Sequence, residues 1–556
     1  MAHTSALLSH NTEDILKTLR QQFTLDDKSL FNITATFLRE VSDGLANYGH
    51  PMAMIPTFVR AVPDGTETGT FLALDLGGTN LRVCEVTLHG DQTFSLRQQK
   101  YKVSEALKTG EVTSLFDYLA DSVDAFLTES GSPSTAVPPS LSRSTTQAPH
   151  SGTFVDDGSD TQVPLALTFS FPVEQTALDS GRLLTWTKGF AAKNAVGKDV
   201  VKLLQDAFDR KHIHVKCVAL VNDTVGALLS RAYTSGGCIL GAIFGTGTNG
   251  AYVEDVANIT KLGNDPAAAQ GGPMIVNTEW GGFNNTRSSL PSTPYDNKLD
   301  RESINPRYQA FEKFISGMYL GEIARNVLLS FVDAAPKPLL FGGRATEGLN
   351  KQWGLDTAIL SEIAEAWEGL GRFAPPAQSN GKADEEERLQ RVRGVVVQRL
   401  AFASDEVSLA DADIVRQVCT LVVDRAARLS ACAVAAVLVQ TGRAHLSESG
   451  QETEGLQDAG KRIGVGVDGS LVEFYPNFQT KLRASLRVLV GAEVESRVDI
   501  GMAKDGSGAG AALCALVAQK QNQALQQRGG YEHDPKYAPS KLRTEEGVAY
   551  ITSMQS

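Results

Sequence analysis

Three glycine-rich turns limit what this 556-residue chain can fold into more than any other feature of its sequence. Each turn follows an apolar, strand-like run and leads into a second run: FLALDLGGTNLRVCEVTL (71–88), CILGAIFGTGTNGAYVEDV (238–256) and RIGVGVDGSLVEFYP (462–476). Glycines between two such runs are typical of tight hairpin turns. The sequence therefore predicts three strand–turn–strand units.

Phosphate binding explains the three glycine turns better than turns without a ligand would. A turn without side chains can present backbone N–H groups to an anion. GTGTNG (245–250) and GVGVDG (464–469) also match the dinucleotide fingerprint, but that site needs a helix directly after the glycines. A strand is predicted after each of them instead, and the chain has no G-x-x-x-x-G-K-[ST] sequence. A nucleotide-binding site of another design is expected.

The composition is that of a globular protein. Lys plus Arg number 52 and Asp plus Glu number 64, and the net charge of −12 argues against a nucleic acid or an acidic membrane as partner. The six cysteines are scattered, so we expect buried thiols and no disulfide framework. No run of about 20 apolar residues offers a membrane span or anchor, and the first residues show no targeting pattern. A cytoplasmic location is expected.

Strand and helix patterns alternate along the chain, which predicts an α/β fold in two lobes. Apolar runs predict strands over 164–173 and 214–223. The spacing of apolar residues predicts helices over 10–49, 114–127, 223–232 and most of 300–442, and small residues open another in 506–518. Polar composition predicts a low-complexity surface insertion at 131–162, a second polar insertion at 445–460 and a poorly ordered tail at 531–556.

Asn222 and Asp223 stand where an apolar strand gives way to a helix. Ligands of α/β proteins bind at the carboxyl ends of strands. Asp223 would equally serve as the N-cap of the helix, and both roles can coexist.

Further polar residues interrupt apolar runs at Ser170, Thr187, Lys188, Glu279 and Glu312. Each has a plain structural explanation, such as a surface charge or a helix-terminal carboxylate. Together they offer the hydroxyl and carboxylate partners that a polyhydroxyl ligand requires.

A metal site is conceivable at His212 and His214, which share one face of a predicted strand near Cys217. No second ligand cluster accompanies them, so we expect no structural metal.

The motifs, taken in order, resemble the eukaryotic hexokinase/glucokinase family, with fungal enzymes as the nearest likeness. The resemblance rests on MIPTFV, LDLGGTNLRV, LTFSFPVEQ, LLTWTKGF, VALVNDTVGALL, FGTGTNGAYVE, NTEWGGF, VGVDGSLVEFYP and DGSGAGAAL. It implies the two-lobed actin-like ATPase (ribonuclease H-like) fold, with small and large domains around a cleft. The small lobe would be 71–221, with a C-terminal helix of about 508–530 packed on it. The large lobe would be 1–70 and 222–507.

The resemblance also implies the activity, ATP-dependent phosphorylation of a D-hexose at its 6-hydroxyl, the first step of glycolysis. Asp223 would be the general base, and Lys188 would stabilise phosphoryl charge and contact the sugar. The remaining sugar-binding residues would be Ser170, Thr187, Asn222, Asn249, Glu279 and Glu312. The ATP phosphates and adenosine would be bound by Gly77, Gly78, Thr79, Asn80, Arg82, Thr246, Gly469 and Ser470. Asp75 would support Mg²⁺ through water.

Two departures from the family pattern concern the nucleotide. The polar residue that usually follows Gly317 is Met318 here, which puts a nucleotide contact there in doubt, and MAKDGSG (502–508) does not match the usual acidic stretch exactly. Hexose and ATP would be the small-molecule partners of a monomer or homodimer.

Three alternatives stay open. A bacterial-type sugar kinase usually carries a cysteine-rich zinc motif, which this chain lacks. A catalytically weak sugar sensor or regulator would show decayed catalytic positions, whereas those named above hold competent residues. An actin-like ATPase without a sugar substrate would not need the stretches around Ser170, Lys188 and Glu279.

Overall fold

The computed structural model describes residues 10–77, 80–129, 162–186, 190–374, 384–446 and 455–527. Residues with expected roles that lie outside these ranges are Gly78, Thr79, Thr187 and Lys188. Nearly all of the 131–162 insertion and the whole of the 531–556 tail also lie outside the described residues.

The chain forms two compact units. Unit 1 comprises Met1–Asp43, Ile239–Tyr252 and Thr278–Ala503, and unit 2 comprises Gly44–Cys238, Val253–Asn277 and Lys504–Ser556. Strands and helices occur in both units, which confirms the α/β class. The lobe limits expected from the sequence stay a prediction.

Unit 2 contains a five-stranded sheet in the order β4-β3-β2-β5-β8. Its strands are β2 (Thr68–Leu76), β3 (Asn80–His89), β4 (Phe94–Lys102), β5 (Val163–Phe169) and β8 (Val215–Val221). β2, β3 and β4 pair antiparallel, whereas β2, β5 and β8 run parallel. Leu76 of β2 pairs with Leu81 of β3, so the first predicted strand–turn–strand unit is confirmed.

The core of unit 2 follows from the two-residue period of these strands. Leu72, Leu74 and Leu76 alternate onto one face and are buried in a cluster with residues of α4 (Val112–Glu129) and α5 (Val200–Arg210). The other elements of unit 2 are β1 (Ile55–Pro56), α3 (Glu105–Thr109), β6 (Val173–Ala177), β7 (Ser180–Leu183), α6 (Asp223–Ser235), α7 (Pro266–Gln270) and β11 (Pro273–Asn277).

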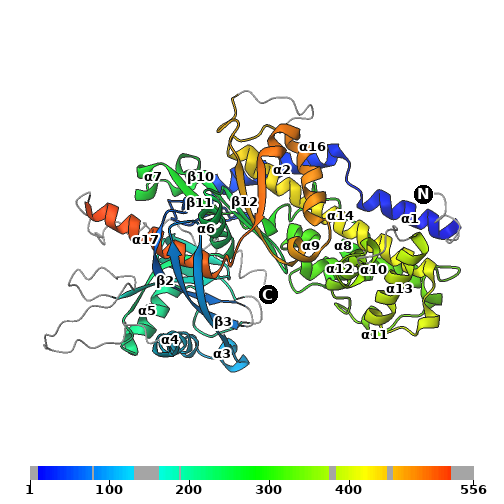
Figure 1. The fold of residues 1–556 in the computed structure, drawn as a ribbon, viewed down its shortest axis with the longest axis horizontal. Coiled ribbons are helices and arrows are strands. Elements are labelled where there is room, and N and C mark those ends of the chain that lie inside the picture. Colours follow the sequence, from blue (N-terminus) through cyan, green and yellow to red (C-terminus); the bar gives the residue numbers. More distant parts are fainter. Residues whose placement is uncertain are drawn as a thin grey trace. The chain divides into compact units, whose positions relative to one another are not determined.

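The C-terminal helix α17 (Gly508–Gln527) packs on β2, β5 and α6, and Figure 1 shows it beside β2. Its small residues permit a close approach to α6. A Cβ added at Gly226 of α6 would lie 2.2 Å from the carbonyl oxygen of Gly506, and one at Gly510 would lie 2.2 Å from Cα of Gly226. Glycine is therefore required where these two backbones meet, and the predicted helix in 506–518 is confirmed.

Unit 1 contains strands in the order β10-β9-β12-β13. They are β9 (Leu240–Phe244), β10 (Thr248–Asp255, which continues into unit 2), β12 (Ile463–Asp468) and β13 (Val498–Met502). β9 and β10 pair antiparallel, with Phe244 opposite Thr248, so the second predicted strand–turn–strand unit is confirmed. β12 runs parallel to both β9 and β13.

Helices make up most of unit 1, as predicted for 10–49 and 300–442. They are α1 (His10–Phe23), α2 (Asp27–Ala46), α8 (Pro294–Glu302), α9 (Ala310–Ile315), α10 (Gly317–Val332), α11 (Glu347–Asn350), α12 (Ala358–Glu368), α13 (Glu385–Leu400), α14 (Leu409–Gln440), α15 (Ser470–Phe474) and α16 (Phe478–Arg497). The long helix α14 packs against α16 and α10 (Figure 1). Arg425 of α14 is fully buried and forms two 2.7 Å hydrogen bonds with Asp296 of α8.

Three local predictions were wrong. The strand predicted after Gly469 is the helix α15, because Leu471 and Tyr475 are buried at helical spacing and the N–H of Glu473 bonds to the carbonyl of Gly469 at 3.1 Å. The N-cap of α6 is Asn222 and not Asp223.

The third wrong prediction concerns the two histidines. β8 begins at Val215, after both of them, and His212 adopts a left-handed φ of 55°. They therefore do not share a strand face. In the part of the chain that the structure covers, no helix is long and apolar enough to cross a membrane.

Candidate functional site

One edge of the unit 2 sheet collects several predicted site residues. The parallel strands β2, β5 and β8 end near one another, since Leu76 pairs with Phe169 and Thr168 pairs with Val221. Gly77, Ser170 and Asn222 directly follow these ends. The carboxyl edge of parallel strands is where α/β proteins bind ligands.

Asp223 is the first residue of α6, immediately beyond this edge. Asn222 has the extended backbone of an N-cap, with φ −85° and ψ 153°, and its Oδ1 accepts a 2.9 Å hydrogen bond from the N–H of Thr224. Oδ1 of Asp223 accepts from the same N–H, also at 2.9 Å. Both side chains are half-buried. The N-terminus of the helix stabilises a negative charge at this position.

Aromatic packing surrounds the stretch that contains Ser170. Phe171 contacts Phe169 at 4.8 Å and Phe190 at 5.0 Å between ring centroids. Trp186 stacks on Phe190 at 5.4 Å and donates from Nε1 to the carbonyl of Ala192 at 2.9 Å. Ser170 is half-buried beside this cluster.

Arg82 of β3 lies opposite Asp75 of β2 and joins two carboxylates. Its Nε and Nη2 donate to Oδ2 of Asp75 at 2.9 and 2.6 Å, and its Nη1 donates to Oδ1 of Asp505 at 3.3 Å. Oγ of Ser507 also accepts from Nη2. Burial alone would lower the pKa of Arg82, but the two aspartates raise it.

Asp505 and Ser507 are functional candidates that the sequence reasoning missed. The one signal for them was their place in KDGSG, just before the glycine-rich helix α17. Gly77 is the last residue described before the first glycine turn, and Asn80 begins β3 after it.

In unit 1, Asn249 and Glu279 are in direct contact. Nδ2 of Asn249 donates to Oε1 of Glu279 at 3.2 Å, and Oδ1 of Asn249 accepts from the N–H of Gly250 at 2.8 Å. Glu279 has a left-handed φ of 53°. Glu312 of α9 reaches the same strand, since its Oε2 accepts from the N–H of Thr248 at 3.1 Å. The structure thus brings three predicted sugar-binding residues to one end of β10.

The glycines around β10 keep these contacts close. A Cβ at Gly247 would lie 2.7 Å from Oε2 of Glu312, and a Cβ at Gly250 would lie 2.3 Å from the ring of Trp280. Nε1 of Trp280 donates to Oγ1 of Thr248 at 3.0 Å. The small residues of GTGTNG therefore serve packing as well as the turn.

The turn after β9 packs against the turn after β12, again within unit 1. A Cβ at Gly245 would lie 3.2 Å from Cα of Gly469, and Gly317 donates its N–H to the carbonyl of Gly245 at 2.7 Å. Thr246 accepts at its carbonyl from the N–H of Met318 at 3.1 Å.

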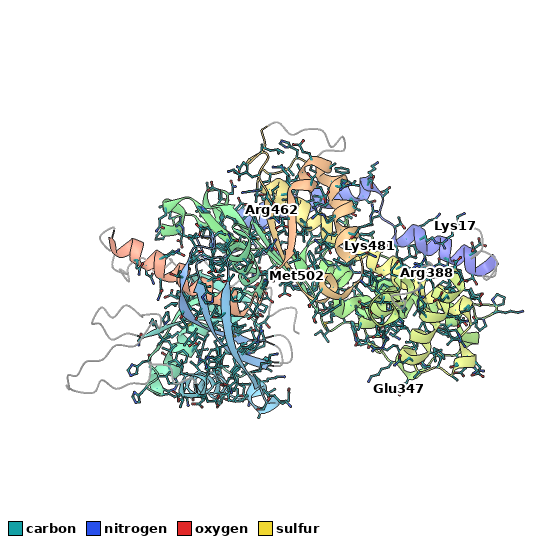
Figure 2. The ribbon with its side chains drawn as sticks, viewed as in Figure 1. Lys17, Glu347, Arg388, Arg462, Lys481 and Met502 are labelled. Carbon is teal, nitrogen blue, oxygen red and sulfur yellow. The ribbon has the colours of Figure 1, made fainter. Side chains whose placement is uncertain are left out.

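Side chains around these two turns are open to solvent. Thr246 and Ser470 are exposed, and Met318 is 50% exposed. Met502, labelled in Figure 2, ends the neighbouring strand β13 and is 37% exposed. The predicted nucleotide residues Thr246, Gly469 and Ser470 are therefore gathered beside two exposed methionines of the same unit.

Each unit thus contains amide, hydroxyl and carboxylate groups of the kind that hold a polyhydroxyl ligand, and unit 2 adds a guanidinium suited to phosphate. Among the residues that the structure covers, no group of three or more His, Cys, Asp or Glu side chains could hold a metal ion. Asp75 and Asp505 are the carboxylates that form ion pairs with Arg82.

Comparison with known proteins gives matches along most of the chain. Two family models, both described as hexokinase, match residues 15–233 and 239–517. The chain is 41% identical to a glucokinase of Aspergillus niger, over 87% of this chain and 93% of the relative. It is 37% identical to glucokinase-1 of Saccharomyces cerevisiae, over 89% and 95%.

A solved structure agrees with the sequence matches. Hexokinase from Schistosoma mansoni, complexed with glucose, superposes with a TM-score of 0.70 at 31% identity, over 91% of this chain and 99% of that one. This likeness confirms the actin-like ATPase fold expected from the sequence.

Proposed function

This chain belongs to the hexokinase family, and on that premise we propose that it transfers the γ-phosphoryl group of ATP to the 6-hydroxyl of a D-hexose, with Asp223 as general base. The products are a hexose 6-phosphate and ADP, in the first step of glycolysis. Glucose is the expected acceptor, because the relatives from A. niger and S. cerevisiae are glucokinases.

The observation that carries the role of Asp223 is its position. It follows β8 at the edge where β2 and β5 also end, and its half-buried carboxylate stands at the N-terminus of α6. The carboxylate accepts the proton of the 6-hydroxyl as the hydroxyl oxygen attacks the γ-phosphorus. The bond from that phosphorus to the bridging oxygen then breaks and ADP leaves. A positioned base of this kind contributes roughly 10²–10⁴-fold in rate.

The hexose hydroxyls are held by the residues that the sequence predicted for them. Ser170 and Asn222 contribute from unit 2, with Thr187 and Lys188, which lie outside the described residues. Asn249, Glu279 and Glu312 contribute from unit 1. The hydrogen bond between Asn249 and Glu279, and the one that Glu312 accepts from the N–H of Thr248, support this role, since bound hydroxyls can replace existing polar partners. Orientation of two substrates supplies about 7–11 kcal/mol of such a barrier.

The nucleotide contacts follow the glycine turns. Arg82 and the turn from Gly77 to Asn80 bind the phosphates, together with Thr246, while Gly469 and Ser470 line the adenosine site. Mg²⁺ bound with ATP neutralises phosphate charge. Asp75 would hold it through water, and the buried carboxylate of Asp75 fits a magnesium site, which commonly uses one or two carboxylates with nucleotide phosphates.

We expect a cytoplasmic enzyme that is a monomer or homodimer. The six cysteines all lie in the described part of the chain, where they are buried thiols outside any disulfide, as in proteins of reducing compartments.

The test is ADP formation by the purified full-length protein with Mg²⁺ and ATP, in parallel with glucose, fructose, mannose and no sugar. The proposal predicts ADP release that depends on sugar, with glucose among the accepted sugars. Equal release without sugar would favour an ATPase without a sugar substrate. No release, with glucose still raising the melting temperature, would favour a sugar sensor.

A further inference from the structure

Arg82 is shared unequally between its two carboxylates. Two of its nitrogens donate to the single oxygen Oδ2 of Asp75 at 2.9 and 2.6 Å, whereas one nitrogen reaches Asp505 at 3.3 Å. Asp505 therefore has only the longer and weaker bond to the guanidinium. All of these residues lie in unit 2.

No side chain donates a hydrogen bond to the second oxygen of Asp505 among the residues that the structure covers. This oxygen, Oδ2, is buried, while the side chain as a whole is 20% exposed. Burial raises the pKa of this carboxyl group and Asp75 adds to the rise, whereas Arg82 and the backbone N–H of Gly508 oppose it. A buried acceptor with few donors costs free energy, so Asp505 gains if a further donor reaches it.

Gly508 keeps the space beside this oxygen open. A Cβ at position 508 would lie 2.7 Å from Oδ2 of Asp505 and 3.3 Å from Sγ of Cys84. Any residue other than glycine would press on this oxygen. The space around Oδ2 therefore depends on how β3 packs against the start of α17.

We propose that Asp505 is a positioning residue that receives Arg82 when a magnesium–nucleotide complex engages Asp75. A divalent cation held near Asp75 would repel the guanidinium. The guanidinium has five donors in a fixed fork and can shift its Nη groups onto Asp505, where Oδ2 can accept them. Arg82 then remains beside the phosphates and no longer neutralises Asp75. This inference rests on the nucleotide site of the proposed function.

Without the Asp505 carboxylate, Asp75 is the one carboxylate partner of Arg82 among the described residues. The guanidinium would then have no second carboxylate to move to when a magnesium–nucleotide complex binds. Asp505→Asn should therefore weaken binding of ADP with Mg²⁺ by about tenfold, the effect of losing one hydrogen bond to a charged group. Binding of ADP without Mg²⁺ should change little, since Arg82 stays at Asp75 in that state.

The experiment measures the dissociation constant of ADP by isothermal titration calorimetry, with Mg²⁺ and with EDTA, for the full-length protein. The variants are Asp505→Asn, Asp505→Glu and Gly508→Ala. Asp505→Glu, which keeps the charge, should retain most of the increase in ADP affinity that Mg²⁺ causes. Gly508→Ala, which crowds Oδ2 without removing charge, should reduce this increase in affinity. It tests the inference independently if Asp505→Asn does not fold.

The matched control is Asp121→Asn, which breaks a surface ion pair with Lys211 of 2.7 Å and should leave both constants unchanged. An unchanged ratio of the two constants in folded Asp505→Asn and Gly508→Ala would overturn the inference, even if their melting temperatures fell. Turnover of glucose by the wild type, measured on the same preparation, tests the proposed function separately. Magnesium-dependent ADP binding without turnover would contradict the proposed function and leave this inference standing.

Discussion

Nδ2 of Asn249 donates a hydrogen bond to Oε1 of Glu279 at 3.2 Å. The amide and the carboxylate orient each other, and the left-handed backbone at Glu279 turns its side chain toward the end of β10. A hydroxyl that binds between them meets both an acceptor and a donor, which suits a sugar better than an apolar ligand.

Glu279→Gln should raise the KM for glucose by about 10–100-fold, because a hydrogen bond to a charged group is worth about 1.5–3 kcal/mol. The KM for ATP should stay within about threefold. Steady-state kinetics with each substrate varied in turn measures both values. Glu347→Gln is the control, since Glu347 is exposed on α11 and labelled on the surface in Figure 2. Equal KM values for glucose in wild type and Glu279→Gln would contradict the sugar role of Glu279.

Gly250→Ala should destabilise the protein by about 1–3 kcal/mol, because the new methyl group would lie 2.3 Å from the ring of the buried Trp280. Thermal unfolding measures the change. Gly394→Ala offers the matched control, since a Cβ there would meet no atom within 4 Å in the middle of α13. That control should be neutral or slightly stabilising. The packing argument fails if both variants melt alike.

Lys261 provides a pH-dependent prediction. Its Nζ donates to the carbonyls of Gly44, Ala53 and Met54 at 2.7, 2.7 and 2.6 Å, and burial lowers its pKa from 10.5 to about 7. Between pH 7 and 10.5 the unfolded chain binds a proton that the folded chain does not, so stability from this group rises with pH in that window. Below pH 7 both states are protonated and the effect is flat.

The test compares melting temperatures of the wild type and Lys261→Met at pH 6, 7, 8 and 9.5. The variant should be less stable by about 1–3 kcal/mol, since three carbonyls lose their donor. The difference in stability between the wild type and the variant should widen from pH 7 to 9.5 and stay constant from pH 6 to 7. A difference that is constant up to pH 9.5 would mean that Lys261 keeps its proton in the folded protein.

The sequence predicted those elements whose signals are local. The strands around Gly77 and Thr246 were found because long apolar runs flank each turn, and α17 because its small residues are followed by an apolar helical pattern. The stretch after Gly469 was misread, since SLVEFYP is short and its β-forming residues fit a strand as well as a helical turn. The burial of this stretch against neighbouring elements favours the helix α15.

Contacts between distant parts of the chain could not be predicted in this way. Asp505 meets Arg82 across 423 positions, and nothing local to KDGSG indicates that partner. The hydrogen bond from Thr248 to Glu312 likewise joins a strand to a helix 64 positions away. The roles of the site residues stay predictions, because they concern substrates and not the folded chain alone.

The central claim is that Asp223 takes the proton from the hexose, and one measurement tests it most directly. Wild type, Asp223→Asn and the surface control Asp121→Asn are incubated with ATP, Mg²⁺ and glucose, and the product is identified and timed by phosphorus NMR. The account predicts glucose 6-phosphate from the wild type and the control, and kcat lower by roughly 10²–10⁴-fold in Asp223→Asn. Glucose should still raise the melting temperature of that variant. Turnover by Asp223→Asn within about threefold of the wild type would contradict the account.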